Sequence, residues 1–377
     1  MKKRLVALLC GMALFAVTVS GCGTVTVTTE STQTDETEAV AEETETEEPK
    51  ETDEEAEEIA EEEPEEAEAE AEEQNVPYEE GVTIRVGGLK GPTSIGLLKL
   101  KDDAANGISG QDYEFTMATA ADEITTALVK GELDIALIPA NVSSVLFNKT
   151  EGKVSVIDIN TLGVLYMVSG DSSIGSVADL EGKTIYLTGK GTTPDYVLQY
   201  VLSSNELLDK VTLEYKSEAT EVAAVLAEDE SAIGLLPQPF VTAACIQNEN
   251  LSVVLDLTKL WDELQTEGGS RLLTGVTIVR NEFLEEHKDA VDAFLYDHNA
   301  SVQATSDDLD AVAALAVSEE IIAKEPIAKK AIPNCNITCI TGEEMKDALS
   351  GYLEVLYDLD PSSVGGALPT DEFYYIQ

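Results

Sequence analysis

Short apolar runs alternate with longer amphipathic segments from Gly81 to the end of the chain, and this alternation limits the folds that are open to it. Val82–Val86 (VTIRV), Asp134–Ile138 (DIALI) and Lys183–Leu187 (KTIYL) have the length and the β-branched content of buried strands. The segments between such runs have helical periodicity. Repeated strand–helix units of this kind predict an α/β fold in which helices flank a mostly parallel sheet.

The order strand–helix–strand–helix–strand occurs twice, first from Val82 and again from about Ser176. The sequence therefore predicts two lobes, each built on its own sheet. A strand at Val276–Val279 and a mostly helical segment then return the chain to the first lobe. Because α/β proteins bind ligands beyond the carboxyl ends of their strands, we expect a ligand cleft between the lobes. The expected bounds are residues 81–175 and 270–377 for lobe 1 and residues 176–269 for lobe 2.

The residues before Gly81 cannot contribute to such a core. Residues 30–80 hold 26 acidic side chains and one basic one, Lys50, and so carry about half of the chain's formal net charge of −50. With Tyr78 as its only aromatic residue, this segment cannot bury enough apolar surface to offset its conformational entropy. We interpret residues 22–80 as a disordered spacer. Cation binding by the carboxylates is the alternative, although no spacing matches an ordered calcium loop.

The first residues have the pattern of an export signal. Three basic residues at positions 2–4 precede an apolar run at 5–19, which is short for a membrane span and has the length of a signal-peptide core. The run closes with the sequence VSGC, whose last residue is Cys22. This resembles the lipobox of bacterial lipoproteins; an ordinary signal peptide with an incidental cysteine is the alternative. The resemblance implies that residues 1–21 are removed and that a lipid on Cys22 anchors the chain to the outer face of the cell membrane.

The charge of the remaining chain bears on its partners. Residues 81–377 carry a formal charge of about −28. Such a surface argues against nucleic acid and against anionic lipid headgroups as partners. It does not exclude a small anionic ligand, because a local site can oppose the field of the whole molecule.

The cysteines and histidines give little indication of chemistry. Cys335 and Cys339 are four residues apart and could form a local disulfide, while three unpaired thiols, with Cys245, fit the sequence equally well. His287 and His298 are the only histidines, and we expect both to be exposed on a polar helix. No metal site, cofactor or catalytic group is therefore expected.

Three segments resemble a known family. Ala127–Ala136 (ALVKGELDIA) is similar to the AL-x-x-G-x-x-D-x-A segment of periplasmic binding proteins of the nitrate, sulfonate, taurine and thiamine-precursor type. Val177–Thr184 (VADLEGKT) resembles the entry of these proteins into their second lobe, and Gly275–Arg280 resembles their return strand. The family's usual proline after this strand is absent, since His287 is followed by Lys288.

The resemblance implies a function as well as a fold. Proteins of this family have a two-lobed type II fold, close on a small solute by a hinge motion, and deliver it to the permease and ATPase subunits of an ABC importer. They do no chemistry on the solute and need no cofactor. Two alternatives remain at this point. One is a sensor or interaction lipoprotein with no role in transport. The other is a pyrimidine-precursor synthase on the same fold, whose Cys-rich stretch and reactive histidine are not visible in this sequence.

Five segments at the ends of predicted strands are candidates for contact with a solute. Gly91–Ser94 and Gly189–Pro194 begin helices just after the first strand of each lobe, so their amides and hydroxyls could hold a small anionic group. Ordinary helix capping is the competing interpretation, and the negative body leaves a neutral or cationic solute as an alternative. Lys190 is either a further contact or a solvated loop charge. The expected contacts are Gly91, Pro92, Thr93, Ser94, Thr119, Ala120, Ala140 and Asn141 on lobe 1, and Gly191, Thr192, Thr193 and Gln238 on lobe 2.

Overall fold

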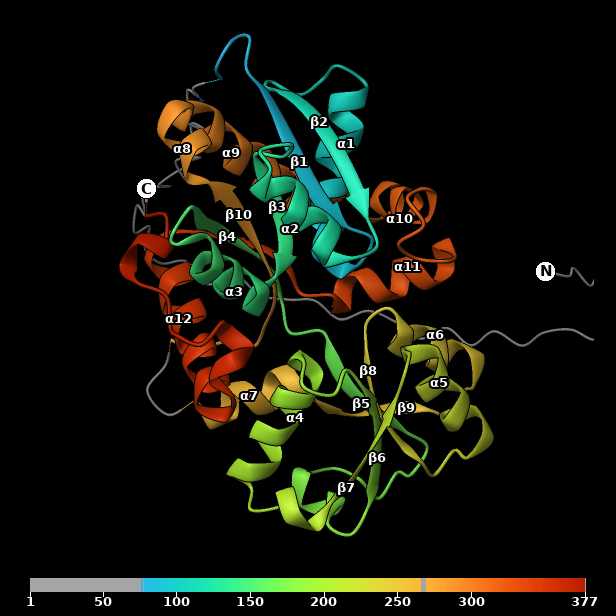
Figure 1. The fold of residues 1–377 in the computed structure, drawn as a ribbon. Coiled ribbons are helices and arrows are strands. Elements are labelled where there is room, and N and C mark those ends of the chain that lie inside the picture. Colours follow the sequence, from blue (N-terminus) through green and yellow to red (C-terminus); the bar gives the residue numbers. More distant parts are fainter. Residues whose placement is uncertain (1–75, 77, 266–268, 377) are drawn as a thin grey trace, which may run out of the picture. The chain divides into compact units, whose positions relative to one another are not determined.

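The computed structural model describes residues 76, 78–265 and 269–376, and Figure 1 shows its helices and strands. The predictions of a signal peptide, of lipidation at Cys22 and of an acidic spacer fall almost wholly outside these residues. The strands are β1 (Thr83–Leu89), β2 (Asp112–Ala118), β3 (Ile135–Pro139), β4 (Val154–Leu162), β5 (Leu165–Ser169), β6 (Thr184–Thr188), β7 (Thr212–Lys216), β8 (Ile233–Pro237), β9 (Ser252–Asp256), β10 (Leu273–Arg280) and β11 (Ile337–Ile340).

The helices lie between and after these strands. The α-helices are α1 (Leu98–Ala105), α2 (Ala121–Val129), α3 (Ala140–Thr150), α4 (Thr193–Ser204), α5 (Ala219–Glu228), α6 (Phe240–Gln247), α7 (Leu257–Leu264), α8 (Asn281–Glu286), α9 (Lys288–Asp307), α10 (Leu309–Ser318), α11 (Glu325–Ala331) and α12 (Gly342–Leu359). The 3₁₀ helices are η1 (Pro92–Leu97), η2 (Val177–Leu180), η3 (Leu208–Lys210), η4 (Ile332–Asn334), η5 (Pro361–Val364) and η6 (Asp371–Phe373). Among the described residues, none of these helices combines the length and the apolar content needed to cross a bilayer.

The first sheet has six strands in the order β11-β4-β10-β3-β1-β2. β1 pairs in parallel with β2 and with β3. The late strand β10 lies antiparallel between β3 and β4, and β11 joins the edge antiparallel to β4. Because β10 follows the whole second sheet in the sequence, its place between β3 and β4 joins the C-terminal part of the chain to the first lobe.

The second sheet has five strands in the order β7-β6-β8-β5-β9. β6 pairs in parallel with β7 and β8, whereas β5 lies antiparallel between β8 and β9. The order β7-β6-β8 repeats the order β2-β1-β3 of the first sheet. The predicted two-lobed α/β fold is therefore confirmed, and the antiparallel strands β5, β9, β10 and β11 make both sheets mixed.

The chain crosses between the sheets one strand earlier than the boundary that we placed after residue 175. β4 ends at Leu162 and β5 begins at Leu165 in the other sheet, so Gly163 and Val164 alone connect them. Both strands are buried along almost their whole length, although β4 holds the polar residues Ser155, Asp158, Asn160 and Thr161, and nothing in the sequence of either strand tells which sheet it will join. The chain returns to the first sheet between α7 and β10.

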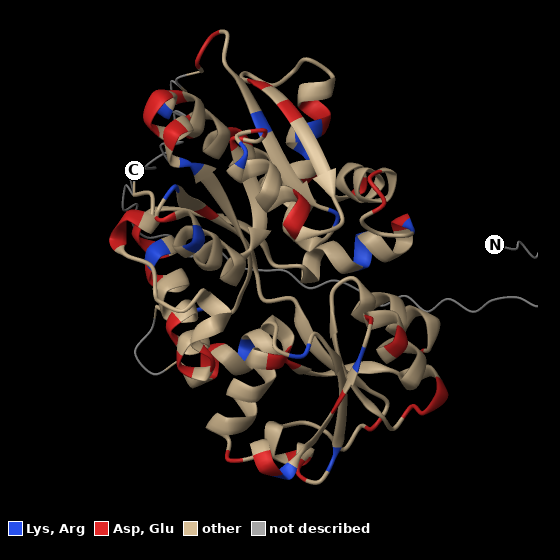
Figure 2. Cartoon of the chain, in the orientation of Figure 1, with Lys and Arg blue, Asp and Glu red and all other residues tan. Residues whose placement is uncertain are grey.

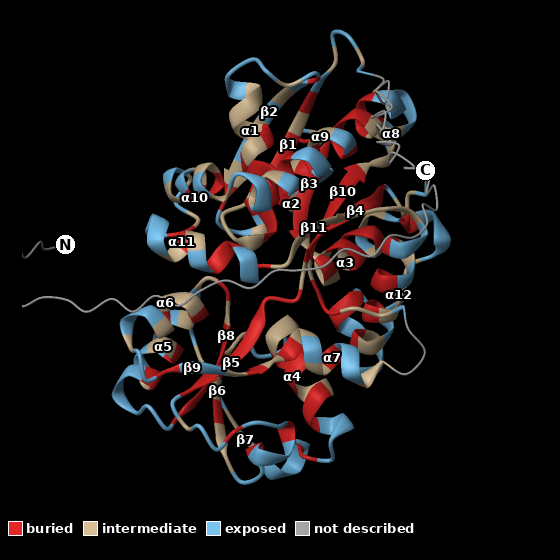
Figure 3. Ribbon diagram, turned by 180° about the vertical axis from the view of Figure 1, so that it is seen from behind, coloured by how far each residue is buried: buried red, intermediate tan, exposed pale blue. Residues whose placement is uncertain are grey.

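Helices cover the sheets, and the inner strands β3, β4, β5, β8 and β10 are buried along almost their whole length (Figure 3). The C-terminal helix α12 packs against β4 of the first lobe and against α4 of the second. Its Tyr352 is fully buried, with its ring centroid 5.7 Å from that of Trp261 on α7. Acidic residues are spread over helices and loops of both lobes (Figure 2), as the net charge requires.

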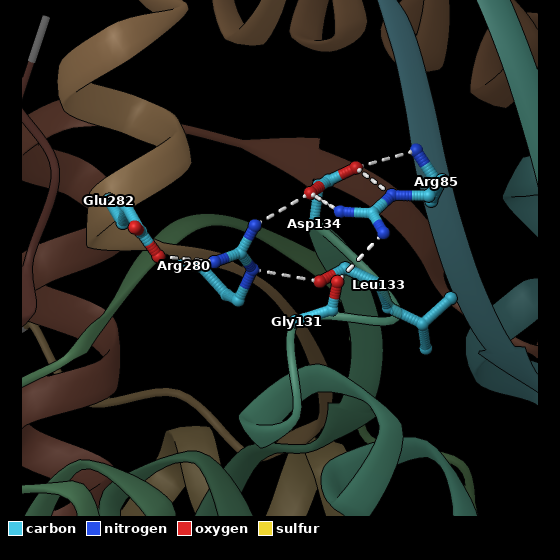
Figure 4. A network of polar contacts seen from close by, with 6 residues as sticks. All are labelled: Arg85, Gly131, Leu133, Asp134, Arg280 and Glu282. Carbon is cyan, nitrogen blue, oxygen red and sulfur yellow. Dashed lines mark hydrogen bonds and ion pairs between the residues drawn. The ribbon is translucent and has the colours of Figure 1, made fainter.

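Asp134, the acidic residue of the first family-like motif, has a structural role (Figure 4). It is 1% exposed and immediately precedes β3. Its carboxylate accepts hydrogen bonds from Nε of Arg85 on β1 at 2.8 Å and from Nη2 of Arg280 on β10 at 2.9 Å. Burial by itself would raise the pKa of Asp134, but the bonds from the two guanidinium groups outweigh it and hold the pKa below its ordinary value. The network thus joins β1, β3 and β10 at the amino end of β3.

Candidate functional site

A pocket of about 570 Å³ takes residues from both lobes, a size suited to a small organic solute. It is bordered by the ends of β3, β4 and β8, by the starts of β5, α3, α4 and α6, and by the segment leading into β10. The polar lining residues are Lys90, Thr93, Asn141, Thr192, Thr193, Gln238 and Thr274. The remaining lining residues are glycines, prolines and apolar side chains: Gly91, Pro92, Pro139, Val142, Gly163, Val164, Leu165, Pro194, Pro237, Pro239, Phe240, Leu272, Leu273 and Ile321.

Two strands that end in proline place the amide side chains of this pocket. β3 ends at Pro139 and β8 ends at Pro237, and a helix begins shortly after each. Proline has no backbone N–H to continue a strand ladder, so the pairing stops at these positions. Asn141 and Gln238 follow the two prolines and line the pocket from opposite lobes. These groups therefore lie beyond the carboxyl ends of parallel strands, where α/β proteins bind ligands.

The structure brings together most, but not all, of the residues expected to contact a solute. Ser94 and Ala140 are 0% and 1% exposed and pack into lobe 1, and Gly191 is adjacent to the lining without being part of it. Thr119 and Ala120 are exposed away from the pocket, because they follow β2, the edge strand of the first sheet. The expected residues that line the pocket are Gly91, Pro92, Thr93, Asn141, Thr192, Thr193 and Gln238.

The helix start on lobe 1 has fewer available donors than the sequence indicated. The segment Pro92–Leu97 forms a six-residue 3₁₀ helix that leads into α1. The amides of Lys90, Gly91 and Ser94 donate to backbone carbonyls at 2.8, 2.8 and 3.2 Å. Pro92 has no amide hydrogen, so the donors left at this turn are the Thr93 amide and the hydroxyls of Thr93 and Ser94, and the buried Ser94 hydroxyl has no partner among the described residues.

On lobe 2 a carboxylate of the protein itself occupies the start of α4. The amide of Gly191 donates to Oδ2 of Asp195 at 2.8 Å. Asp195 is 2% exposed, and its Oδ1 accepts from the Tyr215 hydroxyl at 2.7 Å and from the Gln199 amide at 2.6 Å. Burial and the nearby Asp195 carboxylate together raise the pKa of Tyr215 well above its ordinary value. An anion bound at this helix start would have to approach a negative charge that is already in place.

Two lysines lie near the pocket, and both have partners. Lys90 lines the pocket, and its Nζ donates to Oε2 of the exposed Glu320 at 2.7 Å. Lys190 is not part of the lining, and its Nζ lies 5.2 Å from the centre of the Tyr215 ring, in a cation–π contact. Of the two interpretations of Lys190, a loop charge outside the pocket fits this position better.

Solved structures with a similar fold come from ABC transporters. An ABC transporter protein from Parabacteroides distasonis aligns with a TM-score of 0.66 at 26% identity, over 78% of this chain and 99% of that chain. The periplasmic aliphatic sulphonate binding protein SsuA from Escherichia coli aligns with a TM-score of 0.61 at 15% identity, over 78% of this chain and 92% of that one. The chain has the periplasmic binding-protein fold. The resemblance inferred from the three sequence motifs is thereby confirmed.

A third structure with the binding-protein fold contains a bound molecule. The alkanesulfonate-binding protein SsuA from Xanthomonas axonopodis pv. citri, bound to MOPS, aligns with a TM-score of 0.54 at 15% identity, over 76% of this chain and 94% of that one. These neighbours are binding components of transporters rather than enzymes. No family model and no curated protein matches the chain.

The pocket residues that the sequence analysis missed are mostly apolar and lie where the chain passes between the lobes. Gly163, Val164 and Leu165 belong to the first passage, and Leu272–Thr274 belong to the second. The predicted crossing of the chain between the lobes could have indicated both sets of residues. Every segment that connects the two lobes of a binding-protein fold borders the space between them. Ile321, which follows α10, had no comparable signal.

His298 is buried, contrary to the expectation of an exposed polar helix face. It is 0% exposed, and its Nδ1 lies 3.0 Å from Oδ2 of Asp158 on β4. Thr277 on β10 donates to the other oxygen of Asp158 at 2.8 Å. The Sγ of Cys339 lies within 4.8 Å of the ligand atoms of this histidine and aspartate. None of these residues lines the pocket, and their contacts join α9, β4, β10 and β11 within lobe 1.

The three cysteines in the described part of the chain are unpaired. Cys335 is fully buried, and burial raises its pKa to about 12. Of the two arrangements left open by the sequence, the structure therefore has free thiols at Cys335 and Cys339 rather than a local disulfide.

Proposed function

We propose that this chain is the solute-binding lipoprotein of an ABC importer, held outside the cell membrane by a lipid on Cys22. The observation that carries the proposal is a pocket lined from both lobes of a binding-protein fold. The lobes are joined by the two-residue link between β4 and β5 and by the segment between α7 and β10. Such connections suit a hinge that closes the lobes over a solute and opens them at a permease.

Capture of a solute is tested by thermal denaturation of the purified chain in the presence of a broad panel of small molecules. A solute at 100 times its Kd stabilises the folded state by about 2.7 kcal/mol, which raises the Tm measurably. Thr192 is exposed and lines the pocket, so Thr192→Trp should fill the pocket without disturbing the core. We expect this variant to abolish the solute-dependent rise in Tm. A rise that persists in Thr192→Trp would place the solute elsewhere.

Anchoring and delivery need separate experiments. Cys22→Ala should move the chain from the membrane fraction to the soluble extracytoplasmic fraction, and a variant that stays fully membrane-bound would contradict lipidation at this residue. The residues 22–80 then act as a charged spacer between the lipid and the lobes. Delivery predicts that the chain co-purifies with a permease and an ATPase subunit, and that its loss stops uptake of the captured solute.

A further inference from the structure

The lining of the pocket provides almost no charge. Among the described residues, the lining contains no acidic residue, arginine or histidine, and Lys90 is its single ionisable group. The ammonium group of Lys90 is already paired with Glu320 at 2.7 Å. Most of the surface comes from prolines and from apolar side chains such as Phe240 and Leu272. A charged solute would lose its hydration here without gaining an unoccupied counter-charge, which is a costly exchange.

Two of the helix starts at the pocket have backbone donors that are already used. On lobe 1 the amides of Lys90, Gly91 and Ser94 donate to carbonyls of the protein. On lobe 2 the Gly191 amide donates to Asp195, whose buried carboxylate would repel a second negative charge. The starts of α3 and α6 also border the pocket and hold no acidic residue in their first turns, so the lack of a free counter-charge in the lining, rather than a lack of backbone donors, is what disfavours a charged solute.

Two amide side chains remain as orienting groups, one from each lobe. Nδ2 of Asn141 donates to the Ser363 carbonyl at 3.1 Å, which leaves its Oδ1 as an acceptor. Oε1 of Gln238 accepts from the Thr242 hydroxyl at 2.8 Å, which leaves its Nε2 as a donor. The pocket thus offers neutral hydrogen-bonding groups from both lobes, these two amides and the hydroxyls of Thr93, Thr193 and Thr274, across a mostly apolar lining.

We propose that the solute of this pocket is an uncharged molecule with an apolar body, oriented by neutral hydrogen bonds to polar side chains of both lobes. The inference rests on the proposed solute-binding function and narrows its substrate class. It sets this chain apart from the sulfonate-binding neighbours, whose ligands carry an anionic group. The acidic surface of residues 81–377 acts in the same direction, because it disfavours the approach of anions.

Two fluorescent probes that share one apolar body test this proposal. N-phenyl-1-naphthylamine is neutral, and 8-anilinonaphthalene-1-sulfonate carries the same rings with an added sulfonate. We expect the neutral probe to bind the purified chain at one saturable site, at least about tenfold more tightly than the sulfonate, a difference of about 1.4 kcal/mol. Equal or tighter binding of the sulfonate would overturn the proposal, as would the lack of a saturable site for the neutral probe.

Three variants show whether the probe reports on this pocket. Thr192→Trp should weaken binding of the neutral probe by about tenfold or more, whereas Thr126→Trp, at an exposed position of α2 outside the lining, should leave it within about twofold. A neutral probe that is insensitive to Thr192→Trp, or a sulfonate probe that binds well and is lost in Lys90→Gln, would overturn the proposal.

The same measurements separate failure of this inference from failure of the proposed function. If the chain carries a solute to a permease and that solute proves to be charged, the inference is wrong and the function stands. If the neutral probe binds as expected but no uptake depends on the chain, the substrate class stands and the transport function is wrong.

Discussion

Asp134→Asn removes the charge at the centre of the network that joins β1, β3 and β10, while keeping the size of the side chain. Removing one partner of a buried ion pair costs about 3–5 kcal/mol, because the other partner stays charged and unpaired. The Arg85 side chain is 37% exposed and the Arg280 side chain 17%, so water can partly solvate both once Asp134 is neutral. We therefore expect a loss of about 2–4 kcal/mol in the free energy of unfolding.

The measurement is urea denaturation at pH 7, with Glu282→Gln as the matched control. Glu282 also pairs with Arg280, but its side chain is 75% exposed, so the control should change stability by less than about 1 kcal/mol. A loss below 1 kcal/mol in Asp134→Asn would show that the network does not hold the strands together.

The pH dependence provides a second check on the same residue. Because the pKa of Asp134 is lowered in the folded state, its contribution to stability is fully present above the unfolded value of about 3.9. It is lost as the pH falls through the folded pKa. The difference in stability between the native chain and Asp134→Asn should therefore shrink as the pH is lowered below about 4, and a difference that widens would refute the reasoning.

Three further predictions concern the passages between the lobes and the N-terminal segment. The Tyr166 hydroxyl on β5 donates to the Asn334 carbonyl at 3.0 Å and so links the two lobes. Tyr166→Phe should lower probe affinity by about 2- to 10-fold in fluorescence titrations. Unchanged affinity would mean that this bond does not favour the probe-binding arrangement of the lobes. A Cβ on Gly163 would lie 2.2 Å from Oγ1 of Thr258. Gly163→Ala should therefore lower the free energy of unfolding by about 1–3 kcal/mol in urea denaturation. Unchanged stability would show that the backbone between β4 and β5 can shift to make room for the methyl group. Deletion of residues 24–80 should leave probe affinity unchanged, and a large loss would show that the acidic segment takes part in binding.

Helices and strands of this fold could be predicted where a short stretch of sequence was enough to set both their type and their ends. Strands such as β3 and β8 combine a short apolar run with a terminal proline, so both their type and their ends could be read from the sequence. Their partners could not be read in the same way. β4 and β5 are both buried strands separated by Gly163 and Val164, and only the completed packing assigns them to different sheets. The burial of His298 has the same cause, because it depends on Asp158, 140 residues earlier in the chain.

The start of α4 shows how a correct local signal can still indicate the wrong ligand. Glycines, threonines and a proline before a helix predict a cradle for an anion, and the structure does place Thr192 and Thr193 in the pocket. The residue three positions after Thr192 is Asp195, which completes the T-x-x-D pattern of a helix that caps itself. In the structure its carboxylate accepts from the Gly191 amide, together with Tyr215, so the anion at this helix start belongs to the protein. The start of α4 therefore gives no support for an external anion, because its first turn holds an acid that reaches back to the Gly191 amide.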